Sequence, residues 1–413
     1  MISKLGFKAL RVLRSIWFRP ALYAFAAAAI LALTPVLEPL IPDDWADLIG
    51  DGAVKDILDI LAGTMLAVAI FSLSTMVAAF QMATGQATPR ARALVTRDPV
   101  AQNAIATFIG AFLFSMVGII GLAGQYYSDA GRFILLVFSV ILIIIVVATL
   151  ISWIMRLSSL GGVGEAADRL EEATRDGFLA YRRLLSLGRA VDGPPESFAD
   201  VPAQAIGYVQ HVDGETLGGH AEKWGVEICI LALPGAYAGT ATPLASSSRP
   251  LSEAEADCVR ACFIVGGDRT FELDPRFGLI VLAEIAQRAL SPAVNDPGTA
   301  IDIIGTSVRA LAQCPVGQPS EEARCAGLLI ADFNAEDFVI DAFRVIGRDG
   351  AGLLEVAIRL QKGLGLLARE KPDVFADACR AMADEAFERS KAAMTLEADI
   401  EALRTARREA FEA

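Results

Sequence analysis

Residues 60–89 form an uninterrupted run that contains no acidic, basic or histidine side chain. An α-helix rises about 1.5 Å per residue, so roughly 20 apolar residues are enough to cross the hydrocarbon core of a bilayer. The run is longer than this minimum. It therefore predicts a membrane span that also projects beyond the bilayer.

Small and polar residues recur along this run at steps of three and four, which places them on one face of a helix. They are Ser74, Ala78, Gln81, Gly85 and Thr88. Such a face favours another helix or water over lipid tails. We interpret it either as a packing surface within one subunit or as the lining of a pore or cavity.

The composition also indicates a membrane protein, with 54% hydrophobic residues and a mean hydropathy of +0.48. The chain is too long for a membrane anchor alone, so a second, soluble domain is expected. Residues 1–155 carry 10 Lys and Arg against 9 Asp and Glu, whereas residues 156–413 carry 26 against 40. This acidic second half argues against nucleic acid as a partner.

Four spans are predicted within a transmembrane domain at 20–155. The first covers 20–37, the second is the run described above, and two further apolar runs lie at 102–124 and 133–155. Residues 1–19 combine a basic face with Trp17 and Phe18, a pattern typical of an interfacial amphipathic helix. A secretory signal peptide is the alternative interpretation of this start.

The distribution of charge predicts an orientation. Basic residues precede span one, separate spans two and three, and follow span four, while seven acids occupy the segment 38–59. The positive-inside rule then places both termini and residues 156–413 in the cytoplasm. All six cysteines lie in that half without a Cys-x-x-Cys pair, as expected of reduced thiols.

The expected fold is thus an α-helical integral membrane protein with a mixed α+β, mainly helical, cytoplasmic domain. The soluble half is predicted to contain a connecting helix and linker, a small β module, a helical domain and one C-terminal helix, at 156–200, 201–250, 251–371 and 372–413. Helices are expected at 252–265, 275–290, 298–313, 335–347, 350–370 and 372–410. The last has coiled-coil-like spacing, and packing on its own domain is the alternative.

No enzyme is predicted, because no catalytic constellation, phosphate-binding loop or dinucleotide fingerprint is present. The only two histidines, His211 and His220, match no metal-ligand spacing, so neither a metal nor a cofactor is expected.

One polar stretch between two predicted helices is a candidate site. Its members are Arg288, Ser291, Asn295, Asp296 and Thr299. Asp296 followed by Pro297 is typical of a helix N-terminus, so a structural turn is one interpretation. The other places these side chains around a buried ion or ligand.

Several stretches are similar to those of one bacterial membrane family. They are FSLSTMVAAFQMATGQATPR at 71–90, GYVQHVD at 207–213, LPGAYAGTATPLA at 233–245, Arg269-Thr270, Asp274-Pro275, Phe277-Gly278, ALSPAVNDPGTAID at 289–302 and DFVIDAF at 337–343. Over roughly residues 10–365 the chain resembles the family called domain of unknown function 2254. The resemblance implies a multi-pass protein of the bacterial inner membrane and implies no particular activity.

Two functions remain open from the sequence. The first is a cyclic homo-oligomeric pore or transport protein with a cytoplasmic vestibule, lined by the polar face of span two. Acids at both mouths favour cations, although Arg90 and Arg92 would form basic rings if they faced the axis. The alternative is a membrane-anchored sensor or scaffold without a pore. The expected partners are the lipid bilayer, further copies of the chain and an ion.

Overall fold

The computed structural model describes residues 52–86, 88–91, 99–157, 162–191, 193, 195–315, 324–331 and 334–412, with five helical positions between 21 and 34. These residues form 12 helices and two small sheets. The chain divides into two compact units. The span unit comprises residues 8–85 and 92–165, and the large unit comprises residues 1–7, 86–91 and 166–413.

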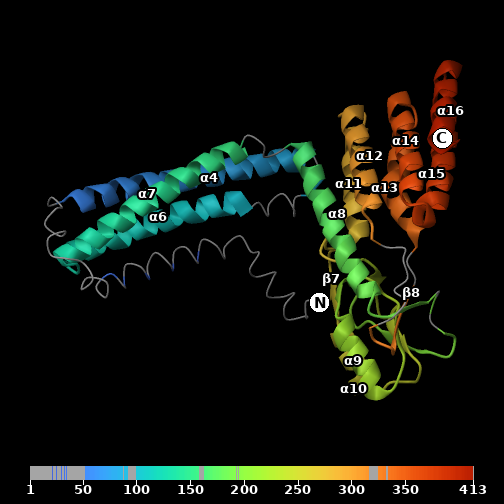
Figure 1. The fold of residues 1–413 in the computed structure, drawn as a ribbon, viewed down its shortest axis with the longest axis horizontal. Coiled ribbons are helices and arrows are strands. Elements are labelled where there is room, and N and C mark those ends of the chain that lie inside the picture. Colours follow the sequence, from blue (N-terminus) through green and yellow to red (C-terminus); the bar gives the residue numbers. More distant parts are fainter. Residues whose placement is uncertain are drawn as a thin grey trace. The chain divides into compact units, whose positions relative to one another are not determined.

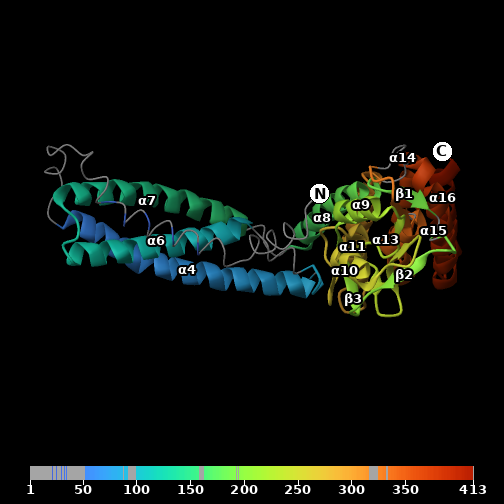
Figure 2. The same ribbon diagram turned by 90° about the horizontal axis from the view of Figure 1, so that it is seen from below.

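The described part of the span unit contains three long helices that lie side by side in Figure 1 and Figure 2. They are α4 (Ala53–Gln86), α6 (Pro99–Ala123) and α7 (Asp129–Leu157). By length and composition, Ala53–Ala79, Val100–Ala123 and Asp129–Leu157 can each cross a membrane. The first predicted span and the amphipathic helix at 1–19 lie outside the described residues, apart from those isolated positions.

Helix α4 begins at Ala53, earlier than the charge-free run predicts. Asp56 lies in its first turn, where an acidic side chain interacts favourably with the helix dipole. The three helices pack through a core contributed by all of them. An idealised Cβ on Gly118 of α6 would lie 3.0 Å from Leu58 of α4, so these two helices approach closely.

Two sheets form part of the large unit. The five-stranded sheet has the order β1-β8-β4-β6-β2, with β8 parallel to both of its neighbours and the remaining pairs antiparallel. Its strands are β1 (Arg189–Val191), β2 (Ala199–Pro202), β4 (Ile228–Ile230), β6 (Pro243–Ser247) and β8 (Leu328–Ala331). The antiparallel three-stranded sheet has the order β5-β3-β7 and consists of β5 (Tyr237–Ala238), β3 (Gly207–Val212) and β7 (Phe263–Gly266).

These sheets extend beyond the predicted β module at 201–250. Strand β1 and the first half of β2 lie in the segment predicted as a connecting helix and linker, and β8 lies far along the chain. The helix predicted at 252–265 is shorter, because α10 (Glu253–Ala261) is followed directly by β7. Phe263, Ile264 and Val265 pair with β3 and thereby exchange helical for sheet hydrogen bonds.

The first helix of the large unit is α8 (Val163–Leu185), which corresponds to the connecting helix predicted within 156–200. Helix α9 (Gly214–Trp224) contacts β4 and β8, and α10 contacts β2 and β7. The remaining helices pack on one another in the pairs α11–α12, α11–α13, α12–α14, α13–α15, α14–α15 and α14–α16. Their bounds are α11 (Pro275–Ala289), α12 (Pro297–Ala312), α13 (Ala335–Asp349), α14 (Leu354–Glu370), α15 (Pro372–Ala393) and α16 (Glu397–Glu412).

The single helix predicted over 372–410 is wrong. Helix α15 ends at Ala393, Met394 adopts an extended conformation, and α16 begins at Glu397. The break lets α16 pack on α14, where Leu403 joins Ala357 and Phe387 in a small buried cluster. Burial of these apolar side chains therefore favours packing of this segment on its own domain over the coiled-coil-like interpretation.

Candidate functional site

The polar face predicted on span two is only partly one surface. Ser74, Ala78 and Gln81 are exposed on α4, and Gly85 is near its end. Thr88 follows the end of α4, is 7% exposed, and accepts a hydrogen bond from the backbone N–H of Ala91. The structure therefore separates Thr88, which belongs to the large unit, from the exposed stripe on the helix.

Other hydroxyl groups on α4 differ in whether they make a hydrogen bond. The Thr75 hydroxyl donates to the carbonyl of Phe71 at 2.7 Å, and that of Thr64 donates to Ile60 at the same distance. Ser72 is 1% exposed, and its hydroxyl has no hydrogen-bond partner among the described residues. The side chains of Ser74 and Gln81 make no hydrogen bond within the described chain either, so this stripe presents unsatisfied polar groups at the surface of the span unit.

Arg90 is not a free cation. Its guanidinium pairs with the carboxylate of Glu284 on α11, and both residues belong to the large unit. Glu284 is an isolated acid in the apolar helix FGLIVLAEIA, which was a sequence signal for a charged partner. Arg92 lies outside the described residues.

The polar turn between α11 and α12 brings its predicted residues together, but on the surface. Arg288, Asn295 and Asp296 are exposed. The Ser291 hydroxyl donates to the carbonyl of Arg288 at 2.6 Å, and Asn295 has φ of 50°, a left-handed conformation that Asn tolerates. The turn thus contains no buried ion or ligand cavity formed by these residues.

Asp296 forms the N-cap of α12. Its carboxylate accepts from the Thr299 backbone N–H at 3.0 Å and from the Thr299 hydroxyl at 2.6 Å. These hydrogen bonds lower the pKa of the Asp296 carboxyl below its ordinary value. The geometry is that of a structural helix cap, in agreement with the first of the two sequence interpretations.

A second polar cluster was not predicted from the sequence as a site. Arg269 binds Asp274 through two hydrogen bonds of 2.7 and 2.9 Å, and Asp274 caps α11 by accepting from the backbone N–H of Phe277. The Asp274 side chain is only 3% exposed. Gly235, at φ of 92°, lies so close that an idealised Cβ would be 2.5 Å from a carboxylate oxygen of Asp274. A residue with a side chain cannot be accommodated there without displacing this pair.

The remaining reactive groups are few. Burial raises the pKa of the Cys229 thiol to about 11 and that of Cys379 to about 12, so neither supplies a thiolate near neutral pH. Within the described ranges, no three His, Cys, Asp or Glu side chains are arranged to hold a metal ion.

A family model described as "Predicted membrane protein (DUF2254)" matches residues 13–365. The chain belongs to this family. It is 28% identical over 308 residues to "Uncharacterized protein MT1328" of Mycobacterium tuberculosis strain CDC 1551 / Oshkosh and to "Uncharacterized protein Mb1321c" of Mycobacterium bovis. These alignments cover 70% of the chain but 58% of each relative, so the chain matches little more than half of their length. No solved structure matches.

Several of the stretches that carry the resemblance to the DUF2254 family contact one another in the large unit, whereas the stretch at 71–90 lies mostly on α4 of the span unit. Arg269, Asp274 and Gly235 form the buried cluster described above, and Arg276 pairs with both Asp337 and Asp341 of the DFVIDAF stretch at 2.6 Å. These ion pairs join α11 to α13. The described contacts of these family motifs are structural, since they join one element of the fold to another.

Proposed function

We propose that this DUF2254 protein forms a homo-oligomeric membrane pore or transport protein, with α4 facing the symmetry axis. The observation that carries the proposal is the exposure of Ser74, Ala78 and Gln81 on a helix long and apolar enough to span a bilayer. Amide and hydroxyl groups in a membrane are found facing other helices or water-filled cavities. Symmetric association satisfies this requirement by turning the stripe away from lipid.

The proposed pore favours cations. Asp56 and Asp59 are exposed near the start of α4, and rotational symmetry repeats them as rings of carboxylates that concentrate cations at a pore mouth. Arg90, beyond the other end of α4, is paired with Glu284 and contributes little net charge. The acids therefore outweigh the only described arginine among the predicted pore-lining residues.

The orientation completes the proposal. Both termini and the large unit lie in the cytoplasm, where the large unit forms a vestibule, and the start of α4 faces the opposite side of a bacterial inner membrane. An Asp47→Cys variant, with Cys258 replaced by serine, should react with an impermeant maleimide on intact cells. Reaction only after lysis contradicts this orientation.

Native mass spectrometry and planar-bilayer recording of the purified chain test the pore itself. We expect a closed oligomer and a cation-selective reversal potential under a salt gradient. Gln81→Leu should lower the conductance several-fold, whereas Leu73→Ile, an apolar exchange at an exposed position of α4 outside the steps of three and four that link the stripe, should leave it unchanged. A monomer, anion selectivity, or equal effects of the two substitutions contradict the proposal.

The second candidate is a membrane-anchored sensor or scaffold without a pore and without catalytic activity. A groove that is lined by four basic side chains favours it, because such a groove offers a binding site formed by the large unit alone. The absence of conductance under all conditions, together with ligand binding by the large unit, would support this second candidate over the pore.

A further inference from the structure

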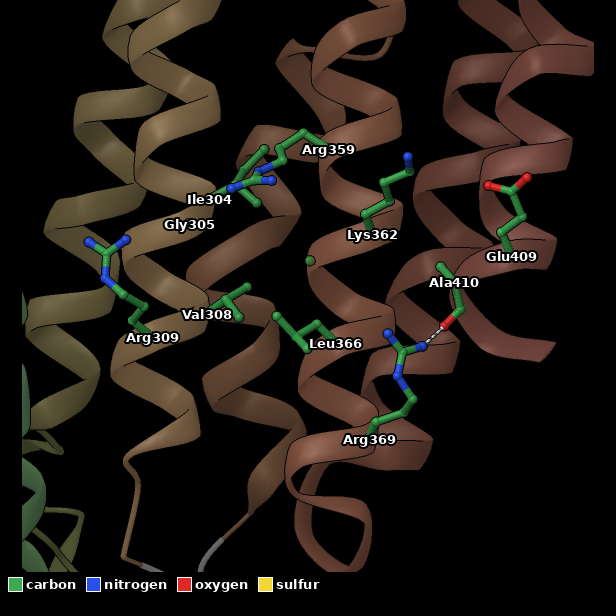
Figure 3. A pocket seen from close by; sticks show the side chains of 11 residues that line it. Ile304, Gly305, Val308, Arg309, Arg359, Lys362, Leu366, Arg369, Glu409 and Ala410 are labelled. Carbon is green, nitrogen blue, oxygen red and sulfur yellow. Dashed lines mark hydrogen bonds between the residues drawn. The ribbon is translucent and has the colours of Figure 1, made fainter. Parts of the chain in front are cut away.

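A groove of about 420 Å³ lies between α12, α14 and α16. Figure 3 shows that α12 contributes Arg309, α14 contributes Arg359, Lys362 and Arg369, and α16 contributes Glu409. The walls also contain apolar side chains from Ile304, Val308 and Leu366. The volume falls within the range of small-molecule sites, which are about 300–1,000 Å³.

Glycines bring the helices and their charges together. An idealised Cβ on Gly305 would lie 3.4 Å from a guanidinium nitrogen of Arg359 and 3.7 Å from one of Arg309, so both guanidinium groups lie next to this position. A Cβ on Gly363 would lie 3.1 Å from Ile304 and 3.2 Å from Val308. Two cations from different helices therefore converge where α12 and α14 pack closely.

The positive charge of the groove is only partly compensated. Arg309 binds Glu171 through hydrogen bonds of 2.7–3.2 Å, and Arg369 donates to the carbonyl of Ala410. Arg359 and Lys362 are exposed and make no ion pair within the residues that the structure describes. The chain as a whole has a net charge of −13, so a groove with four basic side chains and one acid departs from the average charge of the protein.

We propose that this groove binds a phosphate-bearing small anion. Guanidinium groups bind phosphate oxygens through paired hydrogen bonds, and Lys362 adds a flexible ammonium donor. Leu366, which is 44% exposed, offers an apolar surface to the remainder of the ligand. A soluble phosphorylated metabolite and a phospholipid headgroup share this chemistry. The site does not depend on whether the spans form a pore.

The test uses the full chain in phosphatidylcholine nanodiscs and isothermal titration calorimetry. One arm titrates inorganic triphosphate, and the other titrates dihexanoyl phosphatidylglycerol against dihexanoyl phosphatidylcholine. Binding of triphosphate alone identifies a soluble ligand, whereas a preference for the glycerol over the choline lipid identifies a headgroup. If neither probe binds, the proposal is wrong.

Two variants distinguish a site from diffuse charge. Arg359→Gln/Lys362→Gln should weaken binding about a hundredfold, at roughly tenfold for each charged donor. Arg380→Gln/Lys391→Gln removes the same charge from exposed positions of α15 outside the groove and should change affinity less than about twofold, because exposed charges are screened by salt. Equal losses in the two double variants overturn the proposal.

Gly305→Leu fills the space beside Arg309 and Arg359 without changing the charge. Leucine has a higher helix propensity than glycine, so α12 should remain folded. We expect at least about tenfold weaker binding with unchanged hydrogen exchange in α12, which corresponds to 1.4 kcal/mol of binding free energy. Unchanged affinity together with unchanged exchange shows that the ligand does not occupy this groove.

Discussion

The span unit and the large unit satisfy their polar side chains in opposite ways. Hydroxyls of the three spans bond mostly within their own helix: Ser115 donates to Ala111, Ser139 to Leu135 and Ser152 to Ala148, each to the carbonyl four residues earlier. In the large unit, guanidinium groups reach carboxylates on other elements, as Arg276 does to Asp337 and Asp341.

This difference indicates which polar groups provide information about function. A hydroxyl that bonds to its own helix needs no partner, so its presence in a span says little about function. Ser74 and Gln81 do not follow this pattern, since both are exposed on α4 and make no such hydrogen bond within the described residues. In the large unit, by contrast, many charged side chains pair with groups on other elements, whereas Arg359 and Lys362 line one groove and make no ion pair within the described residues.

The largest effect on stability is expected when the buried carboxylate of an ion pair is removed. Asp274→Ala leaves Arg269 without its carboxylate and removes the cap of α11. We expect a loss of about 3 kcal/mol in the free energy of opening of α11, because the guanidinium of Arg269, which is 18% exposed, loses its partner and the helix loses its cap. Hydrogen exchange of the full chain in detergent, followed by mass spectrometry, measures this change.

Glu401→Ala is the matched control, because it breaks an ion pair between exposed partners on α16. Such pairs contribute about 0–1 kcal/mol, so the exchange of α16 should change little. If the two substitutions cost the same, the large unit does not depend on its buried pair and the contrast between the units fails.

The sequence predicts the local elements of both units well, for physical reasons that differ. Three described helices that are long and apolar enough to cross a membrane coincide with the apolar runs, as expected because a helix is the only local way to satisfy a backbone in lipid. The cap at Asp296 is confirmed, because an N-cap residue and its partner lie three positions apart in the chain, and the capping box of α10 at Ser252 and Glu255 has the same spacing. Those distances are fixed by helix geometry alone.

The sequence does not predict what joins distant segments. Strand β8 completes a sheet with β1 and β4, although it is separated from them by helices α10 to α12 and by residues 316–323. The four basic side chains of the groove are spread from Arg309 to Arg369, and only packing of α12 on α14 brings them together. Similarly, nothing in the local pattern at 372–410 reveals that α14 provides a surface for α16.

The next largest loss of stability is expected from removal of the N-cap of α12. Asp296→Ala should lower the free energy of opening of α12 by about 1 kcal/mol, because the Thr299 N–H loses its acceptor. Asp296→Asn is the control, since asparagine is an equally good N-cap. Hydrogen exchange of the first turn of α12 distinguishes them. Loss of a ligand-dependent activity in both variants, without a change in exchange, would favour the ligand-site interpretation of the turn.

A smaller effect is expected in the span unit. Ser139→Ala removes a buried hydroxyl that bonds only to its own helix, at the carbonyl of Leu135. Hydrogen bonds between side chains within membranes contribute about 0.6 kcal/mol on average, and a bond to the same helix should contribute no more. Detergent unfolding followed by near-ultraviolet circular dichroism measures the change. A loss above about 2 kcal/mol would show that Ser139 makes a tertiary contact, and the hydroxyls of the span unit would then not be satisfied within their own helices.

The smallest effect is a pH dependence of the capping box of α10. Hydrogen bonds from Arg249 and Ser252 lower the pKa of the Glu255 carboxyl from its ordinary 4.5 to about 2. Since the folded state favours the ionised form, its contribution to stability is complete above pH 4.5 and disappears as the pH falls towards 2. Glu255→Gln keeps the shape of the box without the charge. Hydrogen exchange of α10 amides from pH 7 to pH 2, corrected for intrinsic rates, gives the opening free energy of the wild type and of this variant. The difference between the two should be constant down to about pH 5 and shrink below it. A difference that stays constant to pH 2 would show that geometry, and not the Arg249–Glu255 charge pair, holds the box together, and this surface pair would then resemble the self-contained hydroxyls of the spans.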